Sequence, residues 1–231
     1  MSDPSSICRE IEAALKPSGI QIRGTTDFAE GEGPLLVDGK YAASVILLGN
    51  VGGSIWPAFS SWKEHYDCPD PLDTWSKEII RPLAKALGGT PYFPSDPPWQ
   101  PFQQWAMRAE GLKPSPLGIL IHPEYGLWHG YRGAIGLPAM VGKSHAGKAV
   151  TVGRHACDVC ETKPCLTTCP VFAICMDPAD FAVSACRSHL VMPSGQGGCM
   201  VSGCLARNAC PVGQAYRYPR EQLKFHMRAL G

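Results

Sequence analysis

The chain has 231 residues, a formal net charge of +1 and 45% hydrophobic residues. These values are ordinary for a globular protein, and the length allows one sizeable core or two small ones. The near-neutral charge provides no general attraction to nucleic acid or to an anionic membrane, so we expect neither as a partner. No apolar run approaches the roughly 18 residues of a membrane-spanning helix, and the N-terminus lacks the layout of a signal peptide. We therefore expect a cytoplasmic protein.

The first 150 residues contain both helical and strand patterns. Apolar residues at helical spacing predict helices over 5–16, 72–88 and 101–111. Apolar runs bounded by turn residues predict strands over 41–50, 117–123 and 127–138, the last two joined by a turn at Glu124–Gly126. This mixture predicts an α+β domain over residues 1–150.

The last part of the chain has little regular pattern until its final helix. We expect that helix over 219–230, with Leu223, Met227 and Leu230 on one apolar face. The rest of residues 151–231 is rich in loops and needs another source of order. The Gly- and Lys-containing stretch 141–150 is the expected junction between the two domains.

The cysteines are concentrated in this second region. The chain has eleven cysteines, and only Cys8 and Cys68 precede residue 157. Disulfides are rare in a reducing compartment, so thiolate ligation of a metal is the better explanation. Two groups of four each end in a Cys-Pro pair: Cys157, Cys160, Cys165 and Cys169, then Cys186, Cys199, Cys204 and Cys210.

This spacing predicts two 4Fe–4S clusters with exchanged fourth ligands. Three thiolates in a short loop can reach three corners of a cubane, and in two-cluster ferredoxins the fourth cysteine of such a run ligates the other cluster. The first cluster would be held by Cys157, Cys160, Cys165 and Cys210. The second would be held by Cys186, Cys199, Cys204 and Cys169.

Other ligand sets stay open at this point. Two zinc sites of four thiolates each would also use eight cysteines, although zinc ribbons usually have two widely separated Cys-x2-Cys pairs. Cys175 or His189 could replace one of the assigned ligands. Otherwise Cys8, Cys68 and Cys175 are expected to be buried or incidental thiols.

The order of the eight cysteines, with "CPVFAI" after the first run, resembles the ferredoxin-type module of epoxyqueuosine reductases and, more distantly, of reductive dehalogenases. The resemblance covers residues 155–215. In those families a cobalamin lies beside one cluster, which reduces the cobalt. The resemblance therefore implies a ferredoxin-like two-cluster module that supplies electrons to a corrinoid.

The segment "GILIHPEYGLWHGYRGAIGLP" at 118–138 is similar to a segment of the cblC-type cobalamin-processing chaperones. That family has a nitroreductase-like α+β fold and binds cobalamin, so the resemblance implies the same for the N-terminal domain. The residues that it implies for cofactor binding are His122, Trp128, Arg132 and Gly133.

Together these features predict an iron–sulfur oxidoreductase. Two 4Fe–4S clusters would receive electrons from a donor protein and pass them to a cobalamin-type centre in the N-terminal domain. One alternative is a ferredoxin-like electron carrier, with a domain that docks a partner enzyme and binds no corrinoid. Another is a zinc-stabilised adaptor. No catalytic side chain is assigned by the sequence.

Overall fold

The computed structural model describes residues 4–142 and 155–230, and the fold combines helices and strands around an antiparallel sheet. Its contacts divide the chain into two units. The first unit runs to Gly111 and resumes at Gly130, whereas the second joins Leu112–His129 to the C-terminal part of the chain. The predicted junction at 141–150 lies almost entirely outside the described residues.

One segment belongs to a different unit from the one expected. Residues 112–129 were assigned to the N-terminal domain, but they pack with the cysteine-rich part. The reason is apolar burial: Ile121 and Leu127 share a hydrophobic cluster with Cys210, and the fully buried Trp128 packs against Tyr218.

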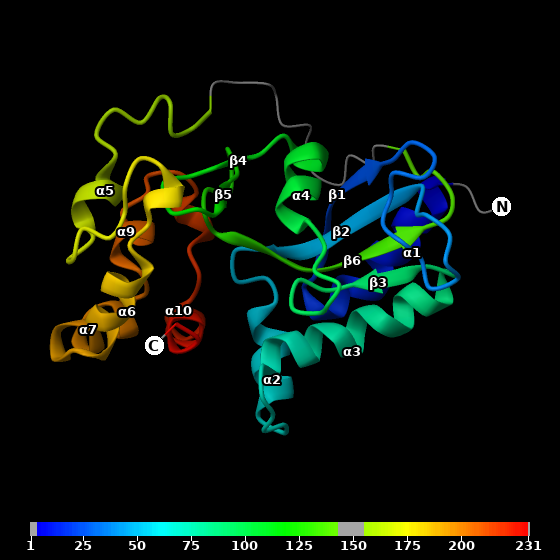
Figure 1. Cartoon of the computed structure of the whole chain (residues 1–231). Coiled ribbons are helices and arrows are strands. Elements are labelled where there is room, and N and C mark those ends of the chain that lie inside the picture. Colours follow the sequence, from blue (N-terminus) through cyan, green and yellow to red (C-terminus); the bar gives the residue numbers. More distant parts are fainter. Residues whose placement is uncertain (1–3, 143–154, 231) are drawn as a thin grey trace. The chain divides into compact units, whose positions relative to one another are not determined.

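The first unit is built on a four-stranded sheet with the strand order β1-β2-β6-β3 (Figure 1). The strands are β1 (Gln21–Asp27), β2 (Ser44–Val51), β3 (Thr90–Tyr92) and β6 (His129–Leu137). β1 pairs antiparallel with β2, and β3 pairs antiparallel with β6. The Ala43 N–H donates to the Leu137 carbonyl, while Gly49 lies against Gly130, so β2 and β6 also run antiparallel.

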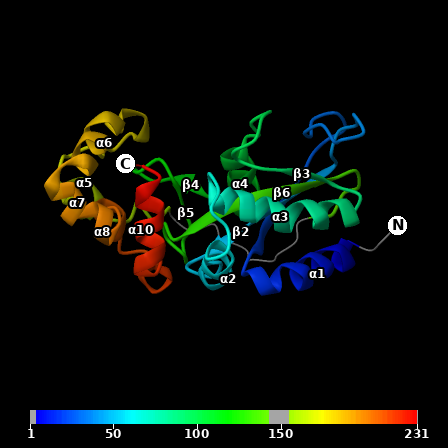
Figure 2. The same ribbon diagram turned by 90° about the horizontal axis from the view of Figure 1, so that it is seen from below.

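Helices cover both faces of this sheet. They are α1 (Pro4–Leu15), continued by a 3-10 turn (Lys16–Ser18), α2 (Trp56–Lys63), α3 (Pro71–Ala86) and α4 (Phe102–Glu110). Figures 1 and 2 show α1 and α3 along one face of the sheet and α4 on the opposite face. β2 is buried from Ser44 to Asn50, as a strand covered on both faces must be. The helices predicted over 5–16, 72–88 and 101–111 and the strand predicted over 41–50 are therefore confirmed to within a few residues.

A buried ion pair links β1 to the end of α4. Arg23 Nη2 lies 2.7 Å from Glu110 Oε2, and the two side chains are 1% and 6% exposed. The Tyr131 hydroxyl donates to Glu110 Oε1 at 2.5 Å, and Arg23 also donates to the Asn50 carbonyl at 3.0 Å. Burial and the neighbouring Glu110 carboxylate raise the pKa of Tyr131, so the phenol stays protonated and keeps this hydrogen bond.

Replacing Glu110 with alanine is expected to destabilise the first unit by about 3–5 kcal/mol, because the Arg23 guanidinium would remain buried without its partner. Tyr131→Phe is the matched control, since it removes one hydrogen bond and leaves the ion pair, with an expected cost of about 1 kcal/mol. Denaturant unfolding monitored by circular dichroism compares the two variants. Equal costs for both would contradict this account of the pair.

The second unit contains short elements only. Its two-stranded sheet pairs β4 (Lys113–Pro114) with β5 (Leu120–Ile121). Its helices are α5 (Pro164–Thr168), α6 (Val183–Val191), α7 (Pro193–Gly197), α8 (Cys199–Ser202), α9 (Leu205–Asn208) and α10 (Arg220–Arg228), with 3-10 turns at Pro178–Asp180 and Gln214–Tyr216. The described residues contain no helix that is both long enough and apolar enough to cross a bilayer.

Two expectations for this unit need correction. The strand predicted over 117–123 is reduced to the two residues of β5, which pairs with β4, whereas the strand predicted over 127–138 is confirmed as β6 and joins the large sheet. The turn between them is also confirmed, because His122 and Gly126 exchange backbone hydrogen bonds of 2.9 and 2.8 Å. In the final helix Leu223 and Met227 are buried as predicted, but Leu230 is 47% exposed because α10 ends at Arg228.

Candidate metal centre

The first cysteine run forms a loop that leads into α5. Cys157 and Cys160 lie in this loop, and Cys165 lies in the first turn of α5. The Lys163 ammonium group donates to the carbonyls of Cys157 and Cys160 at 2.8 and 3.3 Å. One side chain therefore fixes the curvature of the loop that presents the thiols.

Cys210 lies beside this run although it is remote in sequence. Cys210 is buried and packs in one cluster with Ile121, Leu127 and Cys157. Burial, and then the charge of Cys210, raises the pKa of Cys157 to about 11. The same two causes, in the same order, raise the pKa of Cys165. The structure thus brings Cys210 within electrostatic reach of the run that it was predicted to complete.

The second set of cysteines surrounds one cavity. This cavity has a volume of about 280 Å³, and all four predicted ligands of the second cluster line it: Cys169, Cys186, Cys199 and Cys204. Burial raises the pKa of Cys186, and the charges of Cys204 and Cys169 raise it further. Cys169 comes from the first run, so two separate segments supply the thiols of a single cavity.

The walls of the cavity are largely apolar. They include Leu117 and Ile174 from loops, Leu190 from α6, and Leu223 and Met227 from α10. Such walls exclude water from the sulfurs, which strengthens every electrostatic interaction with a bound metal group.

Backbone N–H groups point at several of the sulfurs. The Ala173 N–H donates to Cys169 Sγ at 3.4 Å. Burial raises the pKa of Cys204, and hydrogen bonds from the backbone N–H groups of Arg207 and Ala206 partly offset that rise. The Val212 N–H acts in the same sense on Cys210. Donors of this kind stabilise a thiolate, which is the form that ligates metal.

The two kinds of metal group need different spacings of the sulfurs. Four thiolates around one Zn²⁺ sit at about 2.3 Å from it and so lie close to one another, whereas a four-iron cubane keeps its ligating sulfurs further apart. The four cysteines of the second set line a cavity of about 280 Å³. Among residues 4–142 and 155–230, no three His, Cys, Asp or Glu side chains converge closely enough to hold one metal ion.

Two of the predicted corrinoid-binding residues lie in the second unit and take part in its packing. His122 is buried, and its Nδ1 accepts hydrogen bonds from the N–H groups of Glu124 and Tyr125, both at 3.1 Å. Trp128 is fully buried in a cluster with Tyr218 and Leu223. Both side chains thus have a structural role in this unit.

Gly126, in the turn of this segment, also allows close packing. Gly126 has φ +58, and a Cβ there would lie 2.0 Å from the Val212 carbonyl oxygen. Only glycine lets the two backbones come this close, so the segment packs directly against the turn that follows Cys210. The segment that resembles the chaperone family therefore helps to position a cysteine.

The other two predicted residues, Arg132 and Gly133, lie on β6 in the first unit. Arg132 Nη1 is 4.0 Å from Asp73 Oδ1, which provides the anionic partner that its partial burial calls for. A Cβ on Gly133 would lie 2.8 Å from Ile80 Cδ1, so this glycine allows α3 to pack closely on β6. The predicted set is thus divided, with His122 and Trp128 in one unit and Arg132 and Gly133 in the other.

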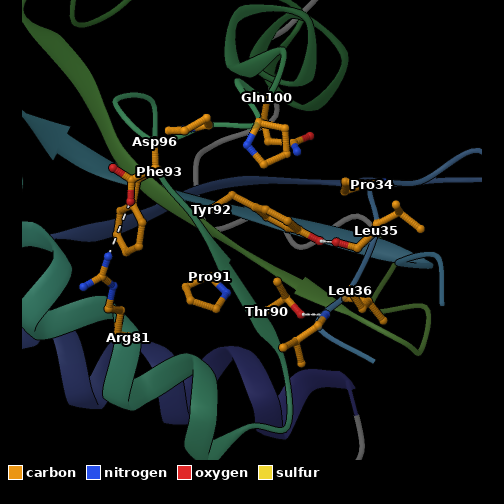
Figure 3. Close-up of a pocket in the computed structure, with 13 residues that line it drawn as sticks. Pro34, Leu35, Leu36, Arg81, Thr90, Pro91, Tyr92, Phe93, Asp96 and Gln100 are labelled. Carbon is orange, nitrogen blue, oxygen red and sulfur yellow. Dashed lines mark hydrogen bonds and ion pairs between the residues drawn. The ribbon is translucent and has the colours of Figure 1, made fainter. Parts of the chain in front are cut away.

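The first unit has a cavity of its own, of about 510 Å³, at its edge strand β3 (Figure 3). Tyr92, whose hydroxyl donates to the Leu35 carbonyl at 2.9 Å, forms part of its lining. Arg81 also lines it and pairs with Asp96 at 3.4 Å. None of the four residues predicted to bind a corrinoid is among its lining residues.

Three features of the candidate metal centre were not predicted from the sequence. They are the hydrogen bonds of Lys163 to the cysteine loop, the N–H donors to sulfur, and the contact of Arg207 with Trp128. Their residue types carry no motif, because each depends on where the folded backbone places one group. No protein-family model matches the sequence, and no curated protein shows significant similarity to it. The arrangement of the thiols is therefore the main support for a function.

Proposed function

We propose that this protein is an iron–sulfur oxidoreductase whose second unit carries two 4Fe–4S clusters. One cluster is held by Cys157, Cys160, Cys165 and Cys210, and the other by Cys169, Cys186, Cys199 and Cys204. The observation that carries the proposal is the cavity lined by all four cysteines of the second set, one of which comes from the first run.

The chain's own residues would hold and insulate these groups. A 4Fe–4S cluster supplies reversible one-electron chemistry at a potential set by its surroundings. The thiolates bind it, the N–H groups of Ala173 and Arg207 donate to those thiolates, and the apolar walls exclude water. No step of proton transfer is required of any side chain, which agrees with the lack of a recognisable catalytic residue.

The electron acceptor that we infer from the sequence resemblance is a corrinoid, for which Arg132 and Gly133 are the implied binding residues that lie in the first unit. Electrons would come from a separate donor protein. A second candidate function, that of an electron carrier without a corrinoid, is favoured by the burial of Trp128 and by the Arg132–Asp73 pair, since both side chains already have intramolecular partners.

Anaerobic reconstitution followed by metal analysis tests the proposal. Two cubanes require about eight iron and eight sulfide per chain, with the broad visible absorption of 4Fe–4S groups. About two zinc and no labile sulfide would overturn the proposal. Titrating the reduced, reconstituted protein with hydroxocobalamin then separates the two redox functions: a change in the corrinoid spectrum with one-to-one binding supports the corrinoid acceptor, and the absence of binding leaves the carrier.

A further inference from the structure

Arg207 occupies an unusual place in the second unit. It lies on α9, with the cluster ligand Cys204 three residues before it and Cys210 three residues after it. Its guanidinium carbon is 4.5 Å from the centre of the Trp128 ring and 4.8 Å from that of Tyr218. Its Nη2 also donates to the Leu127 carbonyl. The guanidinium is thus held in one position beside a pair of aromatic rings that are in edge-to-face contact.

Arg207 is also one of the residues that line the cavity of the second cysteine set. Its Nε is buried and has no hydrogen-bond partner among the residues that the structure describes. A buried donor without an acceptor costs about 1–3 kcal/mol, so such groups usually have a partner in the functional state. The sulfurs of a cluster ligated by Cys169, Cys186, Cys199 and Cys204 are acceptors of the required kind.

We propose that Arg207 sets the reduction potential of the second cluster, by placing a fixed positive charge and an N–H donor against it. This inference rests on the proposed two-cluster function. Reduction adds one negative charge to a cluster, so a nearby cation and hydrogen bonds to sulfur stabilise the reduced form and raise the potential. Arginine suits this role because it stays charged at every accessible pH and because its planar group stacks on aromatic rings.

Partial burial makes the effect specific to one charge. The rings of Trp128 and Tyr218, both in the buried core of this unit, contact the guanidinium and meet each other edge to face, 5.5 Å apart. Charges in such surroundings interact more strongly than exposed ones, which water and salt screen. Arg217 is a natural comparison: it is an exposed arginine of the same unit, bonded only weakly to the Ser202 carbonyl at 3.5 Å, and it does not line the cavity.

The test is a redox titration of the reconstituted protein, followed by electron paramagnetic resonance, in which the second cluster's signal is the one absent from a Cys169→Ala variant. Arg207→Gln is expected to lower the potential of the second cluster and to change that of the first much less. Arg217→Gln is expected to leave both potentials unchanged. An unchanged second potential in Arg207→Gln, with full iron content, would overturn the inference and would show that Arg207 serves packing alone.

Arg207→Lys covers the case in which the glutamine variant does not load its second cluster. Lysine keeps the charge but loses the stacked, planar contact, so we expect a smaller shift in the same direction. A second potential that rises in the lysine variant, or a first potential that falls further than the second, would overturn the inference. Failure of the two-cluster proposal itself is recognised separately, because the unmodified protein would then take up no iron.

Discussion

Replacing Cys169 with alanine is expected to remove the second cluster and to leave the first in place. Cys169 lies in the first cysteine run, yet it lines the cavity shared by Cys186, Cys199 and Cys204. Loss of one of four thiolates leaves a corner of the cubane without a protein ligand. Iron and sulfide should fall to about half of the unmodified value, and one of the two spectroscopic signals should vanish.

Two further variants make this expectation specific. Cys175→Ala changes an exposed cysteine that does not line the cavity, so it should retain both clusters. Cys210→Ala should remove the first cluster, because Cys210 packs beside Cys157 and would supply its fourth thiolate. If Cys169→Ala and Cys210→Ala each eliminated the cluster of their own run, the exchange of fourth ligands would be wrong.

Removing the iron from the reconstituted protein is expected to unfold the second unit and to leave the first folded. The helices α5, α7, α8 and α9 have only four or five residues each, far below the length at which an isolated helix is stable in water. Binding of a metal group to such a unit supplies folding free energy directly. The first unit instead has the continuously buried strand β2 and helices on both faces of its sheet.

Hydrogen exchange followed by mass spectrometry measures this separately for each unit. After anaerobic chelation, amides of residues 155–230 should exchange rapidly, while those of β2 and α3 should keep their protection. The segment 112–129 is the decisive part, because its contacts are with the second unit. Its amides should lose protection together with those of the cysteine-rich region. Full protection of residues 155–230 without iron would contradict the dependence on metal.

The cysteine spacing alone was sufficient to recognise two runs of thiols, but not to assign the fourth ligand of each set. Three thiols within a short loop are constrained by chain length to one locality, so Cys157, Cys160 and Cys165 could be grouped from the sequence. The partner of each run had to be inferred from the habit of two-cluster modules. The cavity around Cys169 and the burial of Cys210 beside Cys157 agree with that inference.

The helices and the buried strand of the first unit could also be predicted, because apolar periodicity is a local property. The strand predicted over 127–138 forms as β6, but the one predicted over 117–123 shrinks to β5, because β6 pairs with β2 and β3 and β5 pairs only with the short β4. Likewise the segment with His122 and Trp128 looked like part of a ligand pocket, but its apolar groups are buried against the C-terminal region.

The sequence by itself therefore determined the two runs of thiols and the main elements of the first unit, and it predicted how the thiols would be grouped. Only the tertiary structure decided which unit the segment 112–129 joins, and only it revealed the cation held against Trp128 and Tyr218. The physical reason is that spacing along the chain constrains neighbours within a loop or helix. Burial, stacking and whether a donor such as Arg207 Nε finds an acceptor depend on residues brought together from distant positions.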